Sequence, residues 1–240
     1  MDGDSQQPSE DSPEAIAARH RQTWFLLGGV VGGVLLLLFL YHWFTQPPPE
    51  PGTGATLSSR QIADVAKPLV GNLRSFAIGG QPQTAGMAVT LAEGEMVTTC
   101  HNLPRAGPLE VAFHDGTSKA EPARLNRELD VCLLRVKTTG RTSAKLRSGD
   151  ATSGEKVYVA VMDKGPPRLV ETRVASLVSE PSGTALRLES REGFATGAAV
   201  FDRQGRLAGI VTAPHTLGDV TLAYSSSRIE KARERQRPTN

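Results

Sequence analysis

The sequence predicts an all-β domain that is followed by a short terminal helix and preceded by one transmembrane helix. Three features support this. An uncharged apolar run ends before residue 50, short apolar runs separated by turns fill residues 55–230, and a helix-capping pattern follows the last run. A chain of 240 residues has room for one sizeable domain with appendages, or for two small ones. A net charge of +2 excludes a strongly basic nucleic-acid binder, and we expect no nucleic-acid partner.

The predicted transmembrane helix covers residues 24–44. Residues 22–49 contain no Asp, Glu, Lys or Arg. A helix of about 20 apolar residues crosses ~30 Å of hydrocarbon. Trp24, Tyr41 and Trp43 lie near its ends, where aromatic rings favour the membrane interface. The alternative is a cleaved signal peptide, but its apolar region is usually only about 7–15 residues long. We therefore predict an uncleaved anchor.

The cations beside this segment predict its orientation. Arg19 and Arg21 precede it, and the first cation after it is Arg60. The positive-inside rule then places the N-terminus in the cytoplasm and the remainder outside, which in a bacterium is the periplasm. Overlapping GxxxG patterns allow two such helices to pack as a homodimer; these patterns are formed by Gly28, Gly29, Gly32 and Gly33.

These features predict five parts of the chain. Residues 1–23 are a disordered cytoplasmic tail because they are rich in Ser, Gln, Asp and Glu. The anchor at 24–44 holds the protein in the inner membrane, and a Pro-rich linker covers 45–55. The folded periplasmic domain spans 56–235, and a tail at 236–240 follows it.

The folded part shows the short apolar runs that are typical of strands in a sandwich or barrel. Asp115–Gly116 and Gln204–Gly205 predict turns between neighbouring strands. A short helix is expected over 62–70, and the pattern Ser227-x-x-Glu230 predicts a capping box at the start of the terminal helix. The expected strands are Met87–Leu91, Met96–Thr99, Leu109–Phe113, Val131–Val136, Lys156–Val161, Val170–Ser176, Ala185–Leu188, Ala198–Phe201 and Leu207–Thr212.

Three stretches of the folded part carry the candidate chemistry. His101 directly follows a predicted strand, Asp130 directly precedes another, and a Gly-containing turn with a hydroxyl at Thr196 precedes a third. A hydroxyl is a poor nucleophile at neutral pH, so an imidazole must take its proton and a carboxylate must orient that imidazole. Taken singly, a histidine after a strand or an aspartate before one is more often structural.

The set of motifs resembles the trypsin-like serine proteases, and most closely the HtrA-like bacterial envelope proteases, over most of residues 75–235. Residues 98–102 (TTCHN) are similar to the family's T-x-x-H-V, and residues 130–136 (DVCLLRV) to its D-[IL]-A-L-L-[KR]-V. The resemblance implies two six-stranded antiparallel β-barrels with a C-terminal helix. It implies the protease domain only, with no PDZ segment after it. His101 would then be the general base and Asp130 its orienting partner.

The same resemblance identifies a degenerate nucleophile loop. Aligning residues 197–202 (GAAVFD) on the family's G-G-P-[LV]-F-D places Thr196 where the nucleophilic serine belongs. Phe194 then stands in place of the oxyanion-hole glycine, and Phe194 and Thr196 would supply the oxyanion donors. The threonine methyl restricts χ1 and crowds attack, and a Cβ at position 194 limits the backbone twist. Ser182 and Ser190 are weaker candidates for the nucleophile.

The resemblance also makes the two cysteines neighbours. If His101 and Asp130 meet, Cys100 and Cys132 lie on adjacent strands, and the periplasm permits a disulfide between them. The alternative is two small buried hydrophobic side chains. We expect no cofactor and no metal site.

Two functions remain open from the sequence. The first is a membrane-tethered endopeptidase that works by acyl transfer through Thr196, with weak or lost activity. The second is an inactive pseudoprotease that binds a polypeptide or an envelope protein partner. The residues His101 and Asp130 favour the first function, and the altered loop favours the second.

Overall fold

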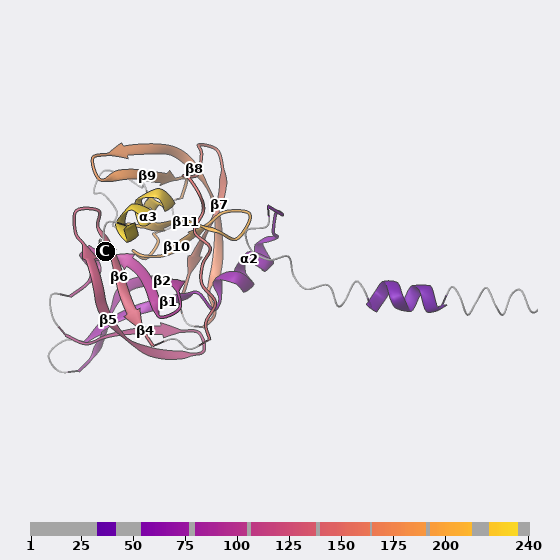
Figure 1. Cartoon of the computed structure of the whole chain (residues 1–240), viewed down its shortest axis with the longest axis horizontal. Helices are drawn as coiled ribbons and strands as arrows, with labels where there is room; N and C mark the ends of the chain where they lie inside the picture. Colours follow the sequence, from indigo (N-terminus) through magenta and orange to yellow (C-terminus); the bar gives the residue numbers. More distant parts are fainter. Residues whose placement is uncertain are drawn as a thin grey trace, which may run out of the picture. The chain divides into compact units, whose positions relative to one another are not determined.

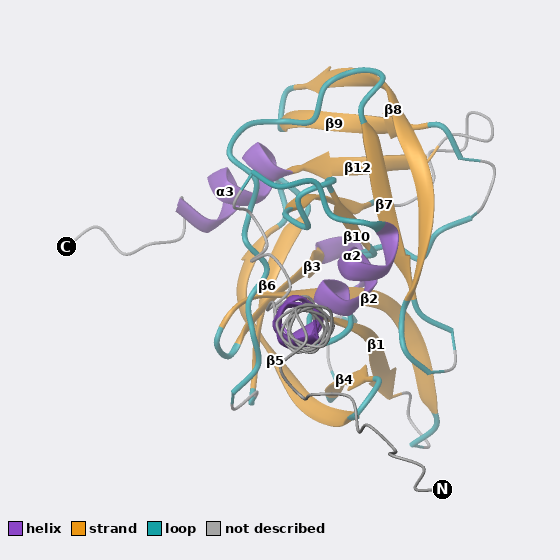
Figure 2. Ribbon diagram, turned by 90° about the vertical axis from the view of Figure 1, so that its right-hand side faces the viewer, coloured by secondary structure: helices purple, strands orange, loops and turns teal. Residues whose placement is uncertain are grey.

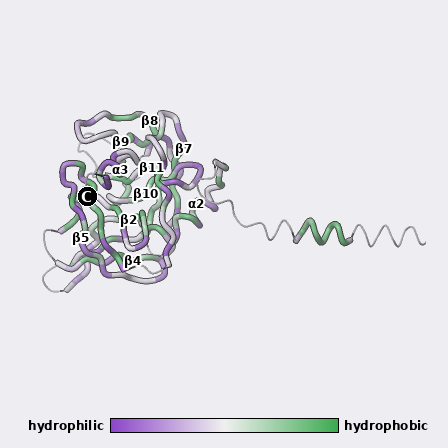
Figure 3. The backbone as a smooth tube through the Cα atoms, in the orientation of Figure 1, coloured by the Kyte–Doolittle hydropathy of each residue, from purple (hydrophilic) through white to green (hydrophobic). Residues whose placement is uncertain are grey.

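The computed structural model describes residues 33–41, 54–76, 80–104, 107–137, 140–163, 165–190, 193–212 and 221–234. The chain divides into two units, residues 1–48 and 49–240. In the first unit a helix covers residues 33–41, and Figure 3 colours most of it as hydrophobic. None of the helices in the described ranges is sufficiently long and apolar to span a bilayer. The rest of the predicted anchor, 24–32 and 42–44, lies outside the described residues, as do 1–23 and 236–240.

The second unit consists of two closed antiparallel barrels of six strands each, which confirms the predicted β architecture (Figures 1 and 2). The first barrel has the strand order β1-β2-β3-β6-β5-β4 and the second has β10-β11-β12-β9-β8-β7. The first barrel contains β1 (Val70–Phe76), β2 (Pro82–Ala92), β3 (Glu95–Thr99), β4 (Leu109–Phe113), β5 (Gly116–Asn126) and β6 (Val131–Val136). The second contains β7 (Lys156–Val161), β8 (Arg168–Glu180), β9 (Gly183–Leu188), β10 (Ala199–Phe201), β11 (Leu207–Val211) and β12 (Thr221–Ser225).

All nine strands that we expected are present, and both predicted turns join neighbouring strands. The apolar pattern did not reveal β5, because most of its side chains face solvent and its register shifts between Pro122 and Arg124. It also did not reveal β1, whose second half is only partly buried, or β12 (Thr221–Ser225). The helix expected over 62–70 is instead α2 (Ser59–Ala66), and Val70 already belongs to β1. Ser58 and Gln61 form a capping box that begins α2.

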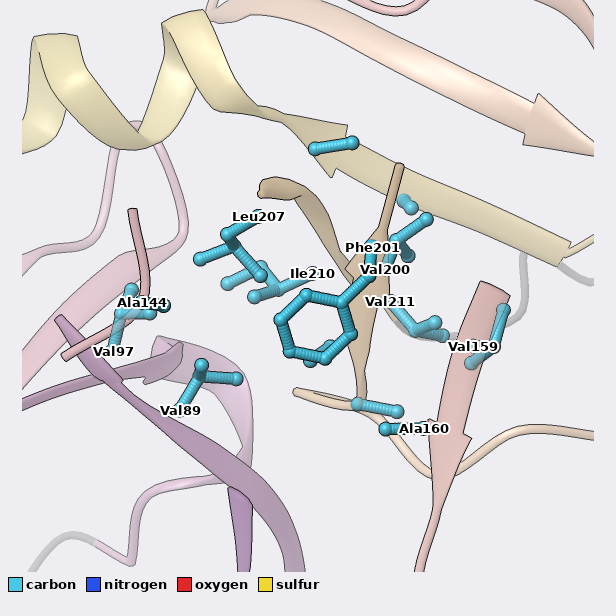
Figure 4. Packing of buried hydrophobic residues seen from close by; sticks show 14 of the residues in the cluster. Val89, Val97, Ala144, Val159, Ala160, Val200, Phe201, Leu207, Ile210 and Val211 are labelled. Atoms are coloured by element: carbon cyan, nitrogen blue, oxygen red, sulfur yellow. The ribbon is translucent and has the colours of Figure 1, made fainter. Parts of the chain in front are cut away.

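Alternation along the strands of the first barrel sends side chains into two cores. On β6, Cys132 and Leu134 point into the barrel interior, whereas Val131 and Leu133 join a larger cluster that is shared with the second barrel. This is the two-residue period of a strand that is buried on both faces. Figure 4 shows the shared cluster, in which Phe201 is fully buried among aliphatic side chains of both barrels. The two barrels therefore share one continuous apolar interface.

The segment that connects the barrels forms hydrogen bonds with both of them. Ala144 donates its N–H to Thr90 of β2 at 2.9 Å, and Leu207 of β11 donates to Lys145 at 2.8 Å. Arg147 in turn donates to Leu207 at 3.0 Å. Because backbone groups from both barrels meet in this short segment, it restrains the barrels relative to each other.

The terminal helix α3 (Ser226–Glu234) packs on both barrels, against β6 as well as β9, β11 and β12 (Figure 2). The predicted capping box at its start is wrong. Ser227 lies inside the helix, and its N–H and hydroxyl both donate to Asp150, at 3.2 and 3.0 Å. A carboxylate from a distant loop therefore caps the helix, because the barrel closure brings that loop to its first turn.

Candidate active site

The histidine of the candidate site is held at the end of β3. The 3₁₀ turn η1 (Cys100–Asn102) follows this strand and carries His101. Because Thr99 pairs with Val131 across β3 and β6, the residue before β6 lies beside the residues after β3. His101 donates its backbone N–H to Asp130 Oδ1 at 2.8 Å, and its Nδ1 lies 2.5 Å from Asp130 Oδ2. The structure thus brings His101 and Asp130 together, and Nε2 is the ring nitrogen that remains for proton transfer.

Asp130 has an unusual backbone conformation. Its φ of 50° makes it the sole residue other than glycine with a positive φ in the part of the chain that the structure describes. Aspartate is one of the few side chains that tolerate this left-handed region. Leu129 donates its N–H to the Asn126 side chain at 3.1 Å, which closes the turn before Asp130. This turn directs the carboxylate back toward η1.

A tyrosine that the sequence did not identify also contacts this carboxylate. Tyr224 of β12 donates its hydroxyl to Asp130 Oδ2 at 2.9 Å. Burial raises the pKa of Tyr224 to about 12, and the negative charge of Asp130 acts in the same direction. No local pattern pointed to Tyr224, because a tyrosine in a strand is ordinary and its partner is 94 residues away.

The hydroxyl of Thr196 pairs with an amide. Asn102 Nδ2 donates to Thr196 Oγ1 and, at 3.0 Å, to Thr99 Oγ1. Among the described residues, no hydrogen bond joins the Thr196 hydroxyl to His101. Asn102 stands where the resembling family has valine, and only the structure shows that this difference reaches the predicted nucleophile.

The loop that carries Thr196 is joined directly to the first barrel. Met87 of β2 donates its N–H to the Thr196 carbonyl at 2.8 Å. Gly86 makes this approach possible: a Cβ at its φ of 120° would lie 2.6 Å from both Asn102 Nδ2 and the Thr196 carbonyl oxygen. In the same loop Phe194 is buried, whereas Gly193 is exposed. The roles of Phe194 and Thr196 as oxyanion donors stay predictions.

A groove of about 580 Å³ brings the site residues to one surface. Both barrels line it: β1, β2 and the η1 region of the first barrel, and the Thr196 loop of the second. Neither Ser182 nor Ser190, the alternative nucleophiles, is among the lining residues. The groove is lined by Ser75, Gln83, Thr84, Ala85, Gly86, His101, Asn102, Leu103, Pro104, Ala195 and Thr196.

The predicted disulfide is confirmed. Cys100 and Cys132 are bonded, with their Cα atoms 5.0 Å apart. Both side chains belong to the apolar cluster inside the first barrel. Cys100 directly precedes His101, and Cys132 lies two residues after Asp130, so the bond ties together the two segments that present the His–Asp pair.

Removing this disulfide is expected to lower the free energy of unfolding by about 3–4 kcal/mol, because the bond closes a long loop in the unfolded chain. The residues that it joins are 32 apart in the sequence. Urea unfolding of a variant with Cys100→Ala and Cys132→Ala measures the change. Reductant should destabilise the wild type to the same level and leave this variant unchanged. Two reactive thiols in the denatured, unreduced protein would contradict the prediction.

Comparison with known proteins places the fold. A family profile described as "Trypsin-like peptidase domain" matches residues 86–210. No curated protein sequence matches the chain significantly. The solved structure of the Rv3671c protease from M. tuberculosis in its active form is similar, with 13% identity and a TM-score of 0.65 over 81% of this chain and 93% of that one.

Two further solved structures are similar over the same fold. The HtrA-type protease AlgW with a tripeptide is 18% identical, with a TM-score of 0.64 over 74% of this chain and 63% of that one. A serine endoprotease from Yersinia pestis is also 18% identical, with a TM-score of 0.63 over 75% of this chain and 67% of that one. At identities this low the likeness shows the fold alone.

Proposed function

Because the chain belongs to the trypsin-like peptidase domain family, we propose that it is a membrane-anchored protein of the bacterial envelope that hydrolyses peptide bonds slowly with His101, Asp130 and Thr196. The observation that carries the proposal is the hydrogen-bonded His101–Asp130 pair, of which His101 lines the same groove as Thr196. The protease fold implies a polypeptide substrate.

In the proposed reaction Thr196 Oγ1 attacks the carbonyl carbon of the scissile bond while His101 Nε2 takes its proton. Asp130 holds the imidazole with Nδ1 as the donor, which leaves Nε2 free to accept. The developing negative charge on the carbonyl oxygen is stabilised by the backbone N–H groups of Phe194 and Thr196. His101 then donates the proton to the leaving amine, and water releases the acyl group from Thr196 by the reverse sequence.

Two features of the loop make this reaction slow. The Thr196 methyl restricts the rotamers from which the oxygen can attack. Thr196 Oγ1 also accepts a hydrogen bond from Asn102, which engages a lone pair that the attack requires. A misplacement of about 1 Å costs on the order of 100-fold in rate. The hydrogen bond from Asn102 to Thr196 also favours the second candidate function, which is an inactive pseudoprotease. Its groove would bind an extended polypeptide or an envelope partner.

Replacing Thr196 tests both functions. With the full chain in detergent, we expect slow fluorophosphonate labelling and slow casein hydrolysis by the wild type, none by Thr196→Ala, and rates about 100-fold higher for Thr196→Ser. His101→Ala in the Thr196→Ser background controls for contaminating protease. An inert wild type with an active Thr196→Ser variant would favour the pseudoprotease. Wild-type turnover that survives Thr196→Ala would show that Thr196 is not the nucleophile.

The membrane anchor is part of the same proposal. It is supported by the uncharged run at 22–49 and by the apolar helix at 33–41. We expect the chain expressed in a bacterium to stay in the carbonate-washed inner-membrane fraction, and a chain without 24–44 to be released.

Added protease should degrade the domain in spheroplasts but not in intact cells. A domain protected in spheroplasts would contradict the proposed topology. Cross-linking through a single cysteine introduced beside the glycines at 28–33 tests the proposed homodimer.

A further inference from the structure

Asp130 is contacted from the second barrel as well as from its own. Tyr224 donates its hydroxyl to Oδ2, the same carboxylate oxygen that lies 2.5 Å from His101 Nδ1. The tyrosine side chain is buried, with only 7% exposed. The phenol is protonated at neutral pH and remains a donor, and burial raises its pKa further, to about 12. The carboxylate is therefore held between two donors on one oxygen and the His101 backbone N–H on the other.

Arg228 of α3 supports both the tyrosine and the backbone before Asp130. Its guanidinium lies over the Tyr224 ring, 3.7 Å from the centroid, which is a cation–π contact. Its Nε donates to the Leu129 carbonyl at 2.9 Å, and a terminal nitrogen pairs with Glu180 at 2.6 Å. Only 3% of Arg228 is exposed. A buried charge is tolerated when it is paired and hydrogen-bonded, and Glu180 supplies the pairing.

The Leu129 carbonyl matters because it belongs to the peptide that joins Leu129 to Asp130. The left-handed conformation of Asp130, with φ at 50°, is less favourable than the usual regions of backbone space. The orientation of that peptide decides where the carboxylate points. Arg228 restrains this peptide by donating to the Leu129 carbonyl oxygen. Tyr224 restrains the rotation of the Asp130 carboxylate by donating its hydroxyl to Oδ2. The two contacts therefore restrain different degrees of freedom of one side chain.

We propose that Tyr224 and Arg228 form a positioning pair that keeps Asp130 directed at His101 Nδ1. The inference deepens the proposed function, since it concerns the group that orients the general base. Neither residue is among those that line the described groove. They act through Asp130, and they make the geometry of the site depend on how α3 and β12 dock on the first barrel.

The proton on His101 Nδ1 gives a direct test. A proton held in a short hydrogen bond to a carboxylate has a far-downfield ¹H resonance, which is lost by solvent exchange when the bond loosens. The experiment uses the full chain in detergent micelles with ¹⁵N-histidine, and His101→Gln assigns the signal. We expect the resonance in the wild type, and its loss in Tyr224→Phe and in Arg228→Met.

A matched control separates positioning from general packing. Tyr158 is similarly buried, with 5% exposed, but it lies on β7, which pairs with β8 and β10 of the second barrel. We expect Tyr158→Phe to keep the resonance at the wild-type position and width. Circular dichroism shows whether Arg228→Met folds. If it does not fold, the resonance of Tyr224→Phe alone tests the proposal. An unchanged resonance in folded Tyr224→Phe would overturn the proposal.

This readout does not require turnover. Thr196→Ala should keep the resonance because Thr196 does not touch Asp130. If Thr196→Ser fails to hydrolyse peptides while the resonance behaves as expected, the proposed function is wrong and the positioning pair stands. The converse result, hydrolysis with a resonance insensitive to Tyr224→Phe, would reject the positioning pair alone.

Discussion

Replacing Asp130 with asparagine is expected to lower the rate of peptide hydrolysis about 10⁴-fold, the size of loss seen when an orienting carboxylate becomes an amide. Asp130 accepts hydrogen bonds from both the backbone N–H and Nδ1 of His101. An asparagine amide group facing Nδ1 would donate instead of accept. The imidazole would then carry its proton on Nε2 and could not act as a base toward Thr196.

The measurement needs a background in which a large loss can be seen. Asp130→Asn is therefore compared within the Thr196→Ser variant, by initial rates of casein hydrolysis and of fluorophosphonate labelling. Asp115→Asn is the control, because Asp115 is half-exposed, pairs with Arg141, and is not among the residues that line the described groove. A loss below about 10-fold for Asp130→Asn would contradict the assigned role of the carboxylate.

The second large effect is on stability. Gly197→Ala is expected to lower the free energy of unfolding by about 3 kcal/mol or more, from overpacking together with a strained backbone. At Gly197 the φ is 81°, and an added Cβ would lie 1.9 Å from the Met87 carbonyl oxygen and 2.9 Å from Thr98 Oγ1. Met87 belongs to β2 and Thr98 to β3, which are paired strands of the first barrel, so the loop must move away.

Gly193→Ala provides the matched control for Gly197→Ala in the same loop. A Cβ at Gly193 would meet nothing within 4 Å. We expect Gly197→Ala to lower the melting temperature by about 10 °C and Gly193→Ala to leave it nearly unchanged. Equal melting temperatures for the two variants would show that the loop is not packed against β2. The prediction also bears on the site, because Met87 holds Thr196 through its N–H at 2.8 Å.

Local patterns predicted much of the fold because they report directly on burial. Short apolar runs such as Val131–Val136 and Lys156–Val161 were placed correctly, since each strand is buried on both faces. By contrast, β5 exposes most of its side chains, so its position depends on pairing with β4 and β6. The capping of α3 was predicted wrongly for a related reason: Asp150 caps the helix from 77 residues away.

For the candidate site, the sequence motifs identified His101, Asp130 and Thr196, but they did not identify the side chains of Asn102 and Tyr224 that contact them. His101 and Asp130 were predicted to meet, and they do, as the β3–β6 pairing requires. The disulfide followed from that same pairing. Asn102 was not singled out in the sequence, although its amide contacts the predicted nucleophile. The membrane anchor and its orientation remain predictions from the charge pattern.

Inspection of the sequence located most of the strands, the family, and the positions of His101, Asp130 and the two cysteines. These depend on side-chain alternation and on motifs within a few residues. The folded chain was needed to show that Thr196 contacts Asn102 and that Tyr224 contacts Asp130, each pair 94 residues apart. It was also needed to show that Arg228 contacts Leu129, 99 residues away. The physical reason is that such contacts arise where one closed barrel packs on another, and no local pattern of burial or turns records that geometry.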